Sequence, residues 1–226
     1  MSRCLIDHIT VTAPSLAEGA EFVHSVLGVF PQTGGEHPRM GTHNLLLRLG
    51  DAVFLEVISA NPLAPPPGRP RWFALDSIAA RSVPSLATWV VRTADINKTL
   101  AGSSEALGNV EPMARGSLNW LISIPPDGSL PLQGVAPAII QWQCDVHPAS
   151  RLPDHGLSLV RLELFDPDPE RIGRLLRSLA LEAPVSVTAG STPRLVAHIN
   201  TRQGLRCLSA ANMLNLTLER EVPFAG

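Results

Sequence analysis

Two ionisable side chains lie inside apolar, β-like segments of the sequence, where a charge rarely occurs without a partner. His8 belongs to the alternating segment 4–13, and Glu56 belongs to the apolar run 53–58. Glu56 is the predicted catalytic residue, either as a metal ligand or as a free general base. Structural explanations compete with both roles. His8 would then be a hydrogen-bonded core histidine, and Glu56 a carboxylate on a solvated face of its strand.

Aromatic and basic side chains complete the predicted site. Trp89 either stacks on a substrate or plugs the cleft, and His43 is either a polar turn residue or a donor to the substrate. Arg48 and Arg115 are arginines that could grip a carboxylate with two hydrogen bonds, although most arginines in a protein carry only surface charge. Together with Trp120, which ordinary core packing would explain equally well, these four form the predicted substrate-binding set.

The elements that must position these residues recur along the chain. Residues 4–13 alternate as a strand, and Pro14-Ser15 opens a helix that Gly28 closes. Strands at 44–49 and 52–59 follow a Gly- and Pro-rich turn, which gives the order β-α-β-β. Similar units repeat further along the chain. Their predicted strands are 86–93, 119–124 and 138–142 in the second unit, and 157–165, 185–188, 195–200 and 206–209 in the third.

This repetition predicts the domain organisation. Residues 1–150 form a double module with units at about 4–60 and 86–145, joined through a proline-rich linker at 61–70. Residues 151–226 form a third, structural unit, which either covers an exposed sheet edge or provides the surface of a homodimer.

An ordered set of short motifs resembles the glyoxalase-like branch of the vicinal oxygen chelate superfamily. The set contains Ile-Asp-His in the first strand, Leu-Glu in a later strand, and residues 41–50, 70–73, 87–89, 120, 139–142 and 147–148. The resemblance implies an α+β fold of βαβββ-type modules, as in glyoxalase, bleomycin-resistance and dioxygenase proteins. Two modules would form a curled sheet around a cleft, and a third, partial module would follow.

The same resemblance implies a divalent metal, with ligands from the first and last strands of both modules. The matching positions are His8, Glu56, Trp89 and Gln141. Trp89 cannot bind a metal, which leaves His8, Glu56 and Gln141 for zinc, manganese, nickel or iron. The implied function is a small-molecule enzyme of the lyase or isomerase type that polarises a carbonyl or two vicinal oxygens. The alternative is a metal-free protein that binds or sequesters a small ligand, of the bleomycin-resistance kind.

Composition restricts the partners. The chain has 226 residues and a formal charge of −2, with 18 basic and 20 acidic side chains, so no basic footprint for nucleic acid or an anionic membrane is present. It has no apolar stretch of the length of a membrane span, and its start does not resemble a signal peptide. Three widely spaced cysteines predict reduced thiols and a cytoplasmic protein.

Overall fold

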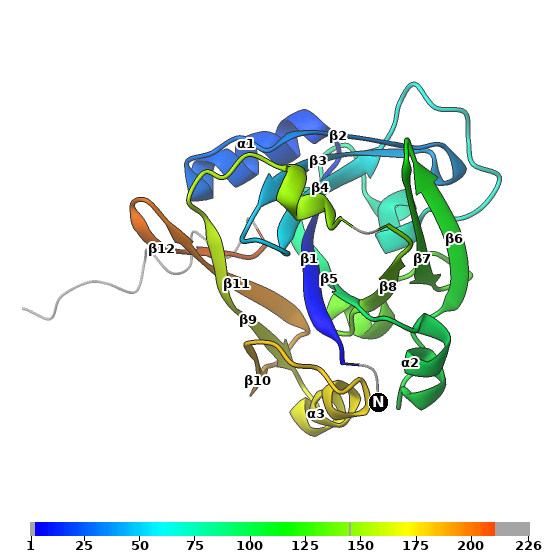
Figure 1. Ribbon diagram of the computed structural model, residues 1–226. Helices are drawn as coiled ribbons and strands as arrows, with labels where there is room; N and C mark the ends of the chain where they lie inside the picture. The colour runs from blue at the N-terminus through cyan, green and yellow to red at the C-terminus, as the bar shows by residue number, and fades with distance from the viewer. Residues whose placement is uncertain (1–2, 145, 211–226) are drawn as a thin grey trace, which may run out of the picture.

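The computed structural model describes residues 3–144 and 146–210, which form two β-sheets and three α-helices (Figure 1). The first module follows the predicted order. Its elements are β1 (Leu5–Thr12), α1 (Leu16–Leu27), β2 (Gln32–His37), η1 (Pro38–Met40), β3 (Thr42–Arg48) and β4 (Phe54–Ala60). Helix α1 begins where Ser15 accepts a hydrogen bond from the Glu18 amide, and it ends at Gly28 in the left-handed conformation. Both predicted ends of this helix are confirmed.

The second module repeats this order after the proline-rich linker. Its elements are η2 (Trp72–Ser77), β5 (Ser85–Arg92), α2 (Ile96–Gly102), β6 (Asn109–Arg115), β7 (Leu118–Ile124), η3 (Pro131–Gly134) and β8 (Ala138–Trp142). The sequence did not predict β2 or β6. Both are edge strands of the sheet, where Gly34, Gly35 and Pro112 are tolerated and regular alternation is not required.

The third unit has the predicted element order but pairs its strands differently. Its elements are η4 (Pro148–Arg151), β9 (Ser158–Asp166), α3 (Pro169–Ser178), β10 (Val185–Ala189), β11 (Arg194–Thr201) and β12 (Gly204–Leu208). Strand β9 lies parallel to β10, which directly follows its helix, whereas β1 lies parallel to β4, the last strand of its module. The predicted boundary at 150/151 stays a prediction, and residues 211–226 lie outside the described residues.

The two modules share one sheet of eight strands in the order β2-β3-β4-β1-β5-β8-β7-β6, joined at the centre by the antiparallel pair β1–β5. The sheet curls until its two edges meet, because Arg39, just after β2, donates to the Glu111 carboxylate of β6 at 2.7 Å (Figure 1). One apolar core joins this sheet to α1, α3 and the second sheet, β10-β9-β11-β12. A second cluster, rich in aromatic rings, occupies the opposite face, inside the curl.

None of the helices within the described ranges combines the length and apolar composition needed to cross a bilayer.

Candidate active site

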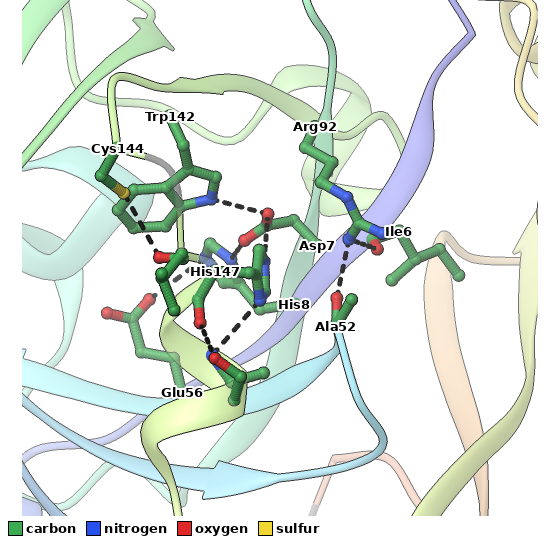
Figure 2. Close-up of polar contacts among 12 residues, drawn as sticks. Ile6, Asp7, His8, Ala52, Glu56, Arg92, Trp142, Cys144 and His147 are labelled. Carbon is green, nitrogen blue, oxygen red and sulfur yellow. Dashed lines mark hydrogen bonds and ion pairs between the residues drawn. The ribbon is translucent and has the colours of Figure 1, made fainter.

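A bulge in β1 places Asp7 and His8 side by side. In the pairing with β5, Ile6 lies opposite Val91 and His8 lies opposite Val90, so Asp7 is an extra residue without a partner. The bulge interrupts the alternation of β1, and the Asp7 Oδ1 atom lies 2.7 Å from His8 Nδ1. Arg92 supports this geometry by donating to the backbone oxygen of Ile6 at 2.6 Å (Figure 2).

Asp7 is a fully buried carboxylate that gathers three hydrogen-bonding side chains (Figure 2). Its Oδ2 atom lies 2.9 Å from His147 Nε2 and accepts from Trp142 Nε1 at 2.8 Å. Burial acts to raise the pKa of Asp7, but the hydrogen bonds with His147 and His8 outweigh it and hold that pKa well below its usual range. The carboxylate therefore stays ionised and fixes the orientation of the His8 ring.

Glu56 faces the free nitrogen of His8. Its Oε2 atom lies 3.7 Å from His8 Nε2, and its Oε1 atom accepts from Asn44 Nδ2 at 2.6 Å. The Asn44 oxygen in turn accepts from Arg115 Nη1 at 3.0 Å, so a polar chain runs from the edge strand β6 to the central strand β1. Burial lowers the pKa of the Arg115 guanidinium and the Glu56 carboxylate opposes this, which leaves Arg115 charged at neutral pH.

Two glycines of β2 make room for this chain. A Cβ atom on Gly34 would collide with Asn44 Oδ1, and one on Gly35 would lie 2.7 Å from Arg115 Cδ. The edge strand therefore approaches the polar side chains more closely than any larger residue would allow. This explains the Gly-Gly pair that the sequence presented only as part of a turn.

We expect Gly34→Ala to destabilise the protein by about 1–3 kcal/mol, because the new methyl group must displace the Asn44 amide from Glu56. Urea unfolding measures this change. Gly173→Ala is the matched control, since that glycine lies within α3, where its nearest neighbour is the end of the Arg177 side chain. The control should stabilise the helix by roughly 0.5–1 kcal/mol. Equal unfolding energies for the two variants would contradict the role of Gly34.

Beside this chain lies a cavity of about 30 Å³ with mostly aromatic walls. That volume holds one or two water molecules. Its walls are His8, His37, Asn44, Phe54, Glu56, Trp72, Phe73, Arg115, Trp120, Ile122, Ile140 and Trp142. Burial, followed by the neighbouring Arg115 charge, lowers the pKa of His37 to about 3, so this imidazole is neutral at pH 7. The buried indole N–H of Trp72 has no hydrogen-bond partner among the described residues.

Two predicted site residues lie on the other face of the sheet. The Gln141 oxygen accepts from the Ile96 amide at 2.9 Å, and the Trp89 ring is fully buried in the main core, with its Nε1 donating to the Val135 oxygen. Neither side chain therefore faces His8 and Glu56. In the antiparallel pairing of β1 with β5, the residue directly across from His8 is Val90.

His43 and Arg48 also lie away from the cavity. On β3, Leu46 pairs with Glu56 and shares its face, so His43 projects from the opposite face. Arg48 is bound to Asp51 at 2.6 Å and lines a separate small pocket. Arg115 and Trp120 do line the cavity beside Glu56, and their substrate-binding roles stay predictions.

Sequence reasoning missed four polar residues of the site: Asp7, His37, Asn44 and His147. No role was predicted for Asp7, because strict alternation would place it on the face opposite His8 and only the bulge brings the two together. A stronger signal was available, because an aspartate in an apolar strand requires partners as much as Glu56 does. His37 and His147 lie at the end of an edge strand and in a loop, where no periodicity marks them.

The donor set does not fit a resident divalent metal. The second module contributes Val90, Ala138 and Ile140 to the apolar cluster inside the curl, on the face where the first module presents His8 and Glu56. None of these three side chains can bind a metal. No group of three or more His, Cys, Asp or Glu side chains in the described part of the chain is arranged as a metal site. A catalytic metal needs about three protein ligands.

Comparison with known proteins agrees with this architecture. A family model described as a glyoxalase-like domain matches residues 6–180. A crystal structure of a hypothetical protein from Staphylococcus aureus has a TM-score of 0.62 at 14% identity, over 84% of this chain and 87% of that one. This likeness shows the fold.

Two enzymes are more distant. Methylmalonyl-CoA epimerase from Streptomyces coelicolor, bound to 2-nitronate-propionyl-CoA, has a TM-score of 0.41 at 19% identity, over 62% of this chain and 97% of its own. Homoprotocatechuate 2,3-dioxygenase from Brevibacterium fuscum has a TM-score of 0.46 at 16% identity, over 86% of this chain and 63% of its own. No curated protein matches the chain. With more than half of its length matched by the family model, the chain belongs to the glyoxalase-like domain family of the vicinal oxygen chelate superfamily.

Proposed function

We propose that this protein is a small-molecule isomerase or lyase that moves a proton between carbon and the His8–Glu56 pair without a resident metal. The observation that carries the proposal is the relay in which Asp7 holds His8 Nδ1 and leaves Nε2 facing Glu56 at 3.7 Å. An imidazole oriented by a buried carboxylate is a typical general base. The second carboxylate gives the site two groups able to exchange the same proton.

The other polar groups favour a carbonyl substrate with an acidic α-hydrogen. When His8 or Glu56 removes that hydrogen, negative charge develops on the carbonyl oxygen. The Arg115 cation, the neutral His37 and the Trp72 N–H, which has no partner among the described residues, all belong to the cavity wall, where they are able to stabilise that oxygen. The aromatic remainder of the wall excludes water and contacts the apolar part of the substrate.

Substrate access requires movement, because the cavity is smaller than any such substrate. Phe73 lines both the cavity and a separate groove of about 310 Å³, and Trp72 stacks on it at 5.5 Å between ring centroids. Phe73 and Ala74 have φ angles of 57° and 54°, in the left-handed region. Such strain costs about 1–3 kcal/mol per residue. Release of this backbone strain favours a displacement of Phe73 and Ala74. Such a displacement would join the groove to the cavity.

Deuterium exchange tests this activity. Small 2-oxo acids, α-hydroxy ketones and thioesters are incubated with the protein in D2O, and NMR follows the loss of the α-hydrogen. We expect catalysed exchange with at least one probe, and a reduction of about 10²–10⁴-fold in His8→Gln and Glu56→Gln. His43→Gln is the matched control, since His43 lies on the opposite face of the sheet, and its rate should equal the wild-type rate.

Metal content provides the second arm of the test. Mass spectrometry measures bound Zn²⁺, Mn²⁺, Ni²⁺ and Fe²⁺ in wild-type protein and Glu56→Ala, after purification without an affinity metal. We expect well below one metal per chain in both. One metal per chain in the wild type, lost in the variant and required for exchange, would refute the proposed mechanism and restore the metal-dependent one.

A metal-free binding protein is the second candidate, and the aromatic walls of the cavity favour it. It predicts binding of apolar aromatic probes with no exchange of any α-hydrogen, and binding that survives Glu56→Gln. The site is built from one chain, so the predicted homodimer is not required for either function. The three free thiols are consistent with the proposed cytoplasmic location.

A further inference from the structure

Three side chains that the proposed site does not use form a chain on the outer face of the second sheet. Cys207 of β12 lies directly across from His198 of β11, and its Sγ atom is 3.4 Å from His198 Nδ1. The other ring nitrogen, Nε2, lies 3.2 Å from Glu163 Oε2 on β9. A thiol, an imidazole and a carboxylate thus stand in series on three neighbouring strands.

The three cysteines of the chain have different surroundings. Cys4 is fully buried, and burial raises the pKa of its thiol. Cys144 is half-buried, and its Sγ atom donates to the Val146 oxygen at 3.5 Å. Cys207 is exposed, and its thiol contacts a histidine. Accessibility to solvent and an adjacent base are therefore combined at one cysteine.

We propose that Cys207 is a nucleophilic thiol that forms mixed disulfides with small-molecule disulfides. The contacts fit a tautomer in which the thiol donates to His198 Nδ1 while Nε2–H donates to Glu163. In the reaction, the Cys207 sulfur attacks one sulfur of the small disulfide and its proton passes to His198. The old S–S bond breaks, a new one forms, and the second sulfur leaves as a thiolate. Excess thiol reverses the reaction.

Two charged groups of β9 lie beside the histidine and act on this proton transfer in opposite directions. The Glu163 carboxylate stabilises the protonated imidazole, as the orienting group does in nucleophilic triads generally. Arg161 Nη2 lies 3.4 Å from His198 Nε2, and its positive charge opposes protonation of the imidazole, so the Glu163 carboxylate must outweigh it. Glu163 and Arg161 come from β9 and Cys207 comes from β12. The two strands that flank β11 therefore both contribute side chains around His198.

Thiol kinetics test the proposal on the full chain. An aromatic disulfide that releases a coloured thiolate reports the rate, and tryptic mass spectrometry after brief exposure to glutathione disulfide identifies the modified cysteine. We expect Cys207 to react on the order of tenfold faster than Cys144 at pH 7. Cys207→Ser should remove the fast phase, and Cys144→Ser should retain it.

Two further variants separate activation of the thiol from its exposure. His198→Gln removes the base, and Glu163→Gln removes only the orienting charge, so both should slow the fast phase, His198→Gln more strongly. Circular dichroism checks that each variant is folded. Three results would overturn the proposal: Cys207 reacting no faster than Cys144, Glu163→Gln and His198→Gln both reacting at the wild-type rate, or first modification at Cys144.

Discussion

Asp7→Asn is expected to lower the exchange rate by about 10²–10⁴-fold while the fold is retained. His147 and Trp142 contact Oδ2, so the amide oxygen of asparagine takes that position and its NH2 group faces His8 Nδ1. An NH2 group is able only to donate, which moves the His8 proton to Nε2. The nitrogen that faces Glu56 then carries a proton and is no longer able to accept one from a substrate.

The measurement is the exchange rate of Asp7→Asn beside that of Asp166→Asn. Asp166 is also a buried aspartate, but its Oδ1 atom accepts from the Asp168 amide beside α3, outside the site. We expect the control to exchange at the wild-type rate. An unchanged rate in a folded Asp7→Asn protein would mean that Asp7 does not set the tautomer of His8.

The same variant should change how stability depends on pH. The folded-state pKa of Asp7 lies below its unfolded value of about 3.9, so the carboxylate stabilises the fold above that pH and loses this contribution as the pH falls towards the folded pKa. Asparagine does not titrate. The difference in unfolding free energy between wild type and Asp7→Asn should therefore be largest near neutral pH and shrink below about pH 4. Urea unfolding of both proteins at each pH gives these free energies. Their difference cancels the contribution of the acidic groups that the two proteins share.

The sequence predicted much of the fold because the repeated units have strong local signals. Helix α1 has a serine cap, an apolar stripe and a terminal glycine, and the central strands are continuous apolar runs. The edge strands β2 and β6 lack such signals because one side of each is unpaired. Their residues are instead selected to approach the cleft, as Gly34 does towards Asn44.

The site was predicted in part for the same reason. Glu56 stood out because a carboxylate in an apolar run needs a partner, and the structure places it beside His8. The geometry of β1 could not be predicted, because a bulge depends on pairing with a strand some eighty residues away. Alignment by pattern alone does not fix which face of a strand a residue occupies, and in a strand one residue exchanges the two faces. Trp89 and Gln141 lie on the face opposite the cavity, and their neighbours Val90 and Ile140 lie inside the curl.

The face that carries His8 and Glu56 makes a prediction of its own. Val90→His combined with Ile140→Glu should create a metal site, because Val90 lies directly across from His8 and Ile140 lines the same cavity as His8 and Glu56. The four side chains would then come from β1, β4, β5 and β8, which are adjacent at the centre of the sheet. Two imidazoles and two carboxylates are suitable ligands for zinc or manganese.

We expect the double variant to be less stable than wild type without metal, because two polar groups replace apolar side chains in the cluster inside the curl. Metal at a hundredfold excess over Kd should restore about 2.7 kcal/mol, a rise in Tm of roughly 5–10 °C. Val90→His with Gln141→Glu is the matched control, since its new carboxylate lies on the opposite face. Equal metal stabilisation of both double variants would show that Ile140 does not face the metal with His8 and Glu56. Stabilisation of the first alone would show that the backbone inside the curl is able to support a metal site, and that the side chains of the second module decide whether a metal binds.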